Sequence, residues 1–118
     1  VEDFGIGFFT KYGDGGVDIS PIADLLKTEI YAIGKDLGIS NEILTAAPTD
    51  GLWENEKTDE EQIGASYSEL EWAMAFNKDT NSITKRQKQV LQIYTKLNRE
   101  NQHKMNAIPI CKIPKNIK

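Results

Sequence analysis

Residues Thr10 to Lys27 read TKYGDGGVDISPIADLLK and join a glycine-rich, acidic turn directly to the start of a helix. The three glycines of this turn permit positive φ angles and let a ligand approach the main chain closely. Ser20 and Pro21 are typical of an N-cap and a first helical residue, and the free N–H groups of a helix start can hold an anion. Hairpin turns use the same residues, so the spacing alone allows either a structural turn or a binding loop.

The apolar residues that follow predict a helix from Pro21 to Leu37, because they recur at the three- and four-residue spacing of one helical face. Gly38 stands where a C-terminal cap is expected, and Ser40 can cap a short second helix that ends at Leu44. The predicted apolar face consists of Ile22, Leu25, Leu26, Ile30, Ile33 and Leu37.

Capping-box spacing predicts two further helix starts, since a hydroxyl residue and a glutamate three residues later can each accept a free backbone N–H. Thr58 and Glu61 mark the first start. Ser66 and Glu69 mark the second, which opens a helix that ends at about Phe76.

A third long helix is predicted from Ile83 to Arg99, with Val90, Leu91, Tyr94 and Leu97 on its inward face. Three other stretches lack a helical period: residues 1–9 are expected to be irregular or strand-like, residues 45–57 a loop, and residues 106–118 an extended tail. The expected fold class of this chain is therefore mostly α.

Length and composition restrict the classes of protein that fit. A chain of 118 residues is one domain or part of one. Its apolar runs are all shorter than the roughly 20 residues that span a bilayer, so we expect no membrane contact. The one cysteine, Cys111, excludes an internal disulfide and fits a reducing compartment, and we expect a cytoplasmic protein.

The charges are divided unevenly along the chain. Residues 1–77 hold 4 basic and 16 acidic side chains, whereas residues 78–118 hold 10 basic and 2 acidic ones. The two halves can attract each other within the chain or across a dimer, and the basic half can meet a phosphate-bearing ligand. Nucleic-acid binding is not expected, because Tyr94 is the one aromatic residue of the basic half and offers no stacking platform.

The glycine-turn stretch resembles a segment of the NAD synthetase family. The resemblance continues through APTDGLWENEKTDEEQIGASYSELEWAM (Ala47 to Met74) and returns at QHKMNAIPI (Gln102 to Ile110). It implies that the chain is the C-terminal portion of an NAD synthetase domain, with residues 1–118 lacking the N-terminal phosphate-binding loop. In the family, the complete enzyme is a doubly wound α/β protein with a parallel sheet, of the adenine nucleotide α-hydrolase-like kind.

The resemblance also implies a reaction and its partners. The family consists of ligases that use ATP and Mg²⁺ to adenylate deamido-NAD, and ammonia then converts the acyl-adenylate to NAD. Family members are homodimers. We expect this chain alone to be inactive, since adenylation needs the missing loop. The alternative is a helical dimerisation or nucleotide-binding module without catalysis.

The resemblance assigns roles to matching positions of this chain. The expected site residues are Lys11, Asp18, His103 and Lys104 for deamido-NAD, Lys27 and Thr49 for ATP, and Asp3 or, one position away, Glu2 for magnesium. A loop from Gly51 to Gly64 is expected to close over the adenylate, with Trp53 as its apolar anchor and with Asp59 and Glu60 as its acidic pair. Solvated lysines, turn residues and surface acids are the plainer interpretations of the same side chains.

Overall fold

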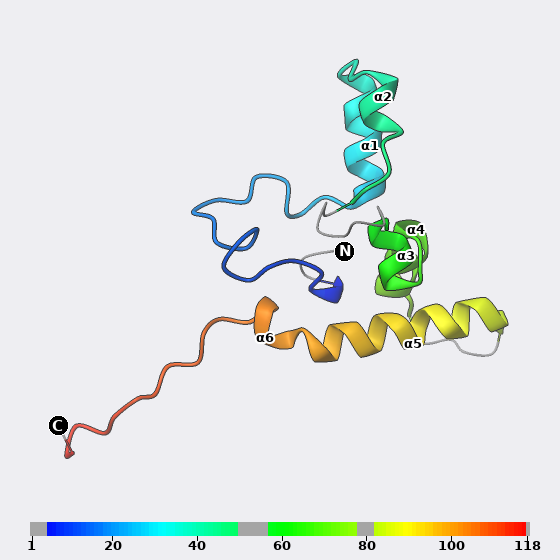
Figure 1. The fold of residues 1–118 in the computed structure, drawn as a ribbon. Helices are drawn as coiled ribbons and strands as arrows, with labels where there is room; N and C mark the ends of the chain where they lie inside the picture. Colours follow the sequence, from blue (N-terminus) through cyan, green and yellow to red (C-terminus); the bar gives the residue numbers. More distant parts are fainter. Residues whose placement is uncertain (1–4, 50–56, 78–81, 118) are drawn as a thin grey trace.

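The computed structural model describes residues 5–49, 57–77 and 82–117, and every regular element in these ranges is a helix (Figure 1). The helices are α1 (Lys27–Asp36), α2 (Asn41–Leu44), α3 (Asp59–Ile63), α4 (Tyr67–Ala75), α5 (Lys85–Glu100) and α6 (Gln102–Met105). The expected mostly α fold class is confirmed for the described part of the chain.

Helix α4 is the centre of the arrangement, because it packs both on α1 and along α5. Helices α1 and α2 lie side by side as one arm, while α5 runs across the opposite end and the tail after α6 leads away (Figure 1). The radius of gyration is 17.8 Å, whereas a compact domain of this length has about 13 to 14 Å. The structure is therefore open.

The apolar core joins the start of the chain to α4 and α5. Ile6, Leu70 and Val90 are its fully buried side chains, and they come from the N-terminal segment, α4 and α5 respectively. Around them pack Phe8, Trp72, Leu91, Ile93, Tyr94 and Leu97. The predicted inward face of α5 is confirmed, since Val90 is buried and Leu91, Tyr94 and Leu97 pack against the same cluster.

The prediction that the first helix begins at Pro21 is wrong. Residues 21–25 form turns, and α1 begins at Lys27. Leu26 has no side-chain acceptor for a helical N–H; instead, the Glu29 carboxylate accepts the Leu26 N–H at 2.7 Å. The apolar face predicted for this helix is only partly covered by the described residues: Leu25, Leu26 and Ile30 are half-buried, whereas Ile22, Ile33 and Leu37 are exposed.

The helix starts predicted at Thr58 and Ser66 are confirmed, whereas Ser40 precedes α2 without a side-chain cap hydrogen bond, and the third long helix spans Lys85–Glu100 instead of the predicted Ile83 to Arg99. Thr58 and Ser66 each form a complete capping box at the start of α3 and α4, and Thr84 does the same for α5. Gly38 follows α1 with a φ of 72°, and Gly64 ends α3 with a φ of 84° in the left-handed region that favours glycine. The short helix α6 was not predicted, and the tail from 106 to 117 contains no helix, as expected.

Among the described residues, an ion pair between α4 and α5 joins the acidic and the basic half of the chain. The Arg86 guanidinium on α5 donates to both oxygens of Glu69 on α4, at 2.7 and 2.6 Å, and also to the carbonyl of Gly64. Hydrogen bonds from Arg86 and from the Ser66 N–H lower the pKa of Glu69 from 4.5 to about 2. Because the charged form of Glu69 is favoured in the folded state, this pair stabilises the fold above pH 4.5 and stops doing so as the pH falls toward 2.

Glu69→Gln is therefore expected to lower the urea midpoint at neutral pH and to change it little near pH 2. The glutamine oxygen can still accept the Ser66 N–H, so the cap survives while the charge on Arg86 loses its partner. Urea unfolding followed by circular dichroism at pH 7 and at about pH 2 would measure both effects. A midpoint difference that stays the same at the two pH values would contradict the assignment.

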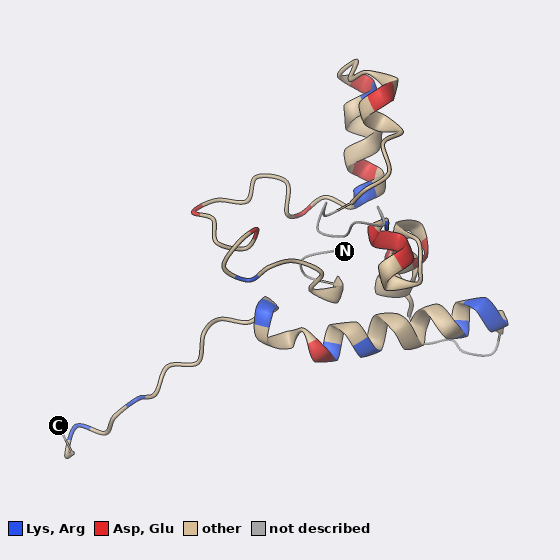
Figure 2. Ribbon diagram, viewed as in Figure 1, with Lys and Arg blue, Asp and Glu red and all other residues tan. Residues whose placement is uncertain are grey.

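The charge division is visible on the folded chain. Acidic residues gather on α1 to α4, and lysines and arginines follow α5, α6 and the tail (Figure 2). Within the described residues, no helix is both long enough and apolar enough to cross a membrane.

Candidate functional site

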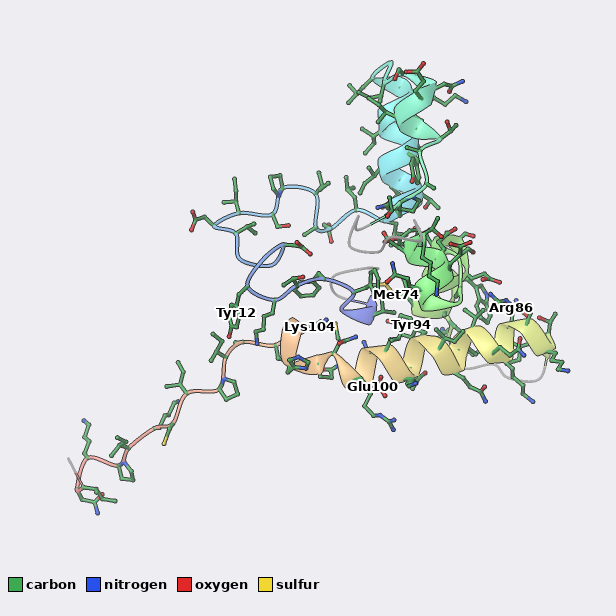
Figure 3. All side chains as sticks on the ribbon, in the orientation of Figure 1. Tyr12, Met74, Arg86, Tyr94, Glu100 and Lys104 are labelled. Atoms are coloured by element: carbon green, nitrogen blue, oxygen red, sulfur yellow. The ribbon has the colours of Figure 1, made fainter. Side chains whose placement is uncertain are left out.

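A cleft of about 370 Å³ lies between the glycine turn and the residues around the end of α6. The two lysines predicted to bind deamido-NAD at these places, Lys11 and Lys104, both line it. Figure 3 labels Tyr12 and Lys104, which both line this cleft. We call this space the glycine-turn cleft; its lining residues are Phe9, Lys11, Tyr12, Asp14, Gly15, Val17, Ser20, Lys104, Asn106, Ala107 and Ile108.

Backbone hydrogen bonds shape the turn itself. The carbonyl of Thr10 accepts the N–H groups of Gly13 and Gly15 at 3.1 and 3.0 Å, and the Asp14 carboxylate accepts the Thr10 N–H at 3.0 Å. The Asp14 carboxylate therefore closes the turn, because it holds the backbone N–H of Thr10.

The turn glycines do not use the positive φ angles that glycine permits. Among the described glycines, positive φ occurs at residues 7, 38 and 64. The turn needs glycine for close packing instead: a Cβ on Gly15 would lie 2.6 Å from a ring carbon of Phe9 and 2.8 Å from the Lys11 carbonyl. On Gly16 it would lie 3.0 Å from the Tyr12 carbonyl.

The lysines of the glycine-turn cleft are held by the protein's own carbonyls. The Lys11 ammonium donates to the carbonyl of His103, and the Lys104 ammonium donates to the carbonyl of Gly7 at 3.0 Å. The Lys104 ammonium also lies 5.8 Å from the centre of the Phe9 ring. A phosphate or carboxylate in this cleft would therefore meet two positive charges whose positions are already fixed.

Two other residues predicted for deamido-NAD lie beside the cleft. The His103 ring is exposed, and its Nδ1 lies 3.2 Å from the Glu100 carbonyl. Asp18 is exposed as well and lies between Val17 and Ser20, which line the cleft.

A second cleft, of about 380 Å³, lies where α1, α3 and α4 meet the loop after α2. Lys27 lines it from the first residue of α1, and Glu60 lines it from α3. Thr49, the other residue predicted for ATP, directly follows the lining residue Pro48 and is exposed. We call this space the α1–α4 cleft; it is lined by Lys27, Thr28, Tyr31, Leu44, Thr45, Ala46, Ala47, Pro48, Thr58, Glu60, Tyr67 and Ser68.

Tyr67 connects Lys27 to the predicted acidic pair. The Lys27 ammonium lies 4.9 Å from the centre of the Tyr67 ring, where it gains a cation–π contact. The Tyr67 hydroxyl donates to Asp59 at 3.1 Å, and the Tyr67 N–H donates to Glu60 at 2.7 Å. The Asp59 N–H in turn donates to the Pro48 carbonyl at 3.0 Å. Asp59 and Glu60 thus brace one wall of this cleft.

Sequence reasoning missed Tyr67 and Glu71 as parts of this wall. Glu71 on α4 accepts from both the N–H and the hydroxyl of Thr28, at 3.1 and 2.8 Å, and so fixes the first turn of α1 beside Lys27. Local sequence holds no signal for this contact, since its partners are 43 residues apart.

Three predicted residues, Glu2, Asp3 and Trp53, lie outside the described residues. The described ranges contain no group of three or more histidine, cysteine, aspartate or glutamate side chains that could hold a metal ion. The magnesium assignment therefore stays a prediction that rests on the resemblance and on carboxylate chemistry, which suits a hard cation.

The family model for NAD synthase matches residues 2–108 of this chain. The NH3-dependent NAD+ synthetase of Alkaliphilus oremlandii is 41% identical over 107 residues, which are 91% of this chain and 40% of that protein. The NH3-dependent NAD+ synthetase of Methanococcoides burtonii is 53% identical over 66 residues, which are 56% of this chain and 25% of that protein.

A solved structure, that of NMN synthetase from Francisella tularensis, matches with a TM-score of 0.76 and 29% identity. The match covers 93% of this chain and 43% of that one. The chain thus spans 25% to 43% of the length of these relatives. Sequence and structure agree, and the chain belongs to the NAD synthase family.

Proposed function

We propose that this chain is the C-terminal part of an NH3-dependent NAD synthetase, a ligase that amidates deamido-NAD with ATP and ammonia. The observation that carries the proposal is the pair of clefts. Lys11 and Lys104 both line the glycine-turn cleft, and Lys27 and Glu60 both line the α1–α4 cleft. Two separate clefts, each lined by at least one lysine, suit a reaction that brings two nucleotides together.

The proposed reaction has two steps. An oxygen of the nicotinate carboxylate attacks the α-phosphorus of ATP, and the bond to pyrophosphate breaks, so that an acyl-adenylate forms. The lone pair of ammonia then attacks the acyl carbon, AMP leaves with the bonding electrons, and the nitrogen loses a proton. Charge develops on the phosphates in the first step, where fixed cations stabilise the transition state most.

In this scheme the α1–α4 cleft takes ATP. Lys27 would meet the polyphosphate, and the Tyr67 ring and the Thr28–Glu71 hydrogen bonds hold its helix end in place. Thr49 would contribute its hydroxyl from the edge of the cleft. Preorganised groups of this kind lower the barrier because they need not reorient during the reaction.

The glycine-turn cleft then takes deamido-NAD. Lys11 and Lys104 would bind its phosphates or carboxylate, and Asp18 would accept from ribose hydroxyls at the margin. His103 stands on α6 beside Lys104, and its Nε2 atom would contact the same ligand while its Nδ1–H donates to the Glu100 carbonyl.

Magnesium and the closing loop complete the proposal. Asp3, or Glu2 next to it, would offer a carboxylate to Mg²⁺, which neutralises phosphate oxygens when bound. The predicted loop from Gly51 to Gly64, with Trp53 as anchor, would exclude water that hydrolyses an acyl-adenylate, while its α3 part serves as a fixed wall of the α1–α4 cleft.

The chain needs a second portion of protein for turnover. It contains no Ser-Gly-Gly sequence of the phosphate-binding loop, and its relatives hold more than half of their length outside the matched region. We therefore expect no NAD formation by the 118 residues alone. We propose a homodimer for the whole enzyme, as in the family.

The test joins this chain to the N-terminal part of the Methanococcoides burtonii relative and measures NAD formation with ATP, magnesium, ammonia and deamido-NAD. In this active protein, Lys27→Met is expected to lower kcat/KM for ATP by about 10- to 100-fold, since a charge-assisted contact is lost. Lys35→Met, an exposed charge in the last turn of the same helix, is the control and is expected to change it less than about twofold.

Equal effects of the two substitutions would overturn the ATP assignment of the α1–α4 cleft. Binding of deamido-NAD without any turnover by the joined protein would favour the module without catalysis.

A further inference from the structure

Three side chains at the end of α5 and on α6 hold the start of the chain in register. Asn98 donates to the carbonyl of Gly5 at 2.7 Å, Asn101 to that of Ile6 at 2.8 Å, and Lys104 to that of Gly7 at 3.0 Å. The donors are three residues apart and share one side of the helical segment, while the acceptors are consecutive. We call these three bonds the amide ladder, after its two asparagine members.

The amide ladder is connected to the glycine-turn cleft by a second set of amides. Asn106 lines that cleft and donates to Gln102 at 3.0 Å, and Gln102 donates to the side-chain oxygen of Asn98 at 2.8 Å. Since the oxygen of Asn98 is used in this way, its NH2 group is directed to Gly5. A continuous chain of hydrogen bonds thus runs from the cleft lining to the first described residues.

Close packing reinforces the same contact. Gly7 has a φ of 63°, and a Cβ placed on it would lie 2.5 Å from the Cβ of Asn101. Ile6, whose carbonyl is held by Asn101, is a fully buried core residue. The segment therefore cannot slide along the helix without breaking hydrogen bonds and core packing together.

The two lysines of the cleft depend on this register. Lys104 lines the cleft and is itself the third member of the ladder. Lys11 lies four residues beyond Gly7 and donates back to the carbonyl of His103. The ladder therefore fixes the distance between the two ammonium groups. It holds the helical segment that carries Lys104 against the N-terminal segment that leads to Lys11.

We propose that Asn98 and Asn101 are positioning residues for the glycine-turn cleft: they hold residues 5–7 so that Lys11 and Lys104 face one anionic ligand together. Neither asparagine lines the cleft, so each acts through the segment it holds. The identity of the ligand as deamido-NAD rests on the proposed function.

The first experiment needs no ligand. Backbone 15N relaxation is measured on the 118-residue chain and on the double variant Asn98→Asp/Asn101→Asp, whose carboxylates cannot donate to the carbonyls. Order parameters of residues 5–11 are expected to fall from about 0.85 to below about 0.6, while those of α5 stay near 0.85. A segment that stays rigid in the variant would overturn the proposal.

The control variant is Gln89→Glu/Gln92→Glu, which adds two carboxylates at exposed positions of the same helix, away from the ladder. It is expected to leave the order parameters of residues 5–11 unchanged. An equal loss of order in the control would attribute the effect to charge and would overturn the proposal.

The second experiment measures deamido-NAD binding to the same chains by calorimetry, well below their unfolding temperatures. The ladder variant is expected to raise Kd about tenfold, and the control less than about twofold. Lys11→Met is expected to raise Kd about tenfold in the wild-type background and less than about threefold in the ladder variant, because the lysine is already misplaced there. If Lys11→Met raised Kd by the same factor in the wild-type chain and in the ladder variant, the asparagines would serve only stability, and the positioning role would be overturned.

These results separate this proposal from the proposed function. A wild-type chain that binds no deamido-NAD counts against that ligand, and the relaxation experiment alone then decides whether the ladder holds the segment.

Discussion

Leu70→Ala is expected to lower the free energy of unfolding by about 3–5 kcal/mol. Leu70 is fully buried on α4, where the core cluster joins Ile6 from the N-terminal segment and Val90 from α5. Removing its side chain leaves a cavity at the one place where these three parts meet, and the small core has few other side chains that could fill it. Urea unfolding followed by circular dichroism would measure the change.

Met74→Ala on the same helix is the matched control. Met74 is 44% exposed, and its truncation is expected to change the free energy of unfolding by less than about 1 kcal/mol. Similar losses for the two substitutions would show that α4 is not the centre of the core.

Gly7→Ala is expected to destabilise the fold by about 2 to 4 kcal/mol. Two separate costs add here: a φ of 63°, which alanine rarely adopts, and a Cβ that would lie 2.5 Å from the Cβ of Asn101. The segment must move away from α6, and the Lys104 ammonium then loses its acceptor, so deamido-NAD affinity is expected to fall as well.

Gly38→Ala separates the two costs of the Gly7 substitution. Gly38 has a φ of 72°, and a Cβ there would meet nothing within 4 Å. This substitution carries only the backbone cost, which is about 1 to 2 kcal/mol. Thermal or urea unfolding of both variants gives the comparison, and equal losses would mean that the contact between Gly7 and Asn101 is not tight.

The features that could be predicted from the sequence are local ones. Thr58 and Ser66 each need only a glutamate three residues away to cap a helix, and both capping boxes form as expected. The inward face of α5 follows from one repeating spacing in the same way. In the two clefts, Lys11, Lys27 and Lys104 could be anticipated because their surrounding motifs resemble a known family.

The features that were missed depend on contacts between distant residues. Helix α1 begins at Lys27, where Glu29 accepts the Leu26 N–H and Glu71 on α4 accepts the Thr28 N–H. The Ser20–Pro21 start has no such support from another helix, and the chain forms turns there instead. The three hydrogen bonds of the amide ladder likewise join residues whose sequence separation is between 93 and 97 positions, and no local pattern encodes such contacts.

The exposed apolar residues at the far end of α1 have a consequence for the orientation of Lys27 in the α1–α4 cleft. The helix is tied to α4 through its first turn, by the Thr28–Glu71 hydrogen bonds, while Ile33 and, just past its end, Leu37 are exposed. Because these hydrogen bonds hold α1 at its first turn, a force on its other end would tilt the helix about that turn. A group that packed on Ile33 and Leu37 would act on the end of α1 that lies away from these hydrogen bonds, so the expected result is a change in the tilt of α1 and in the angle at which Lys27 enters the α1–α4 cleft.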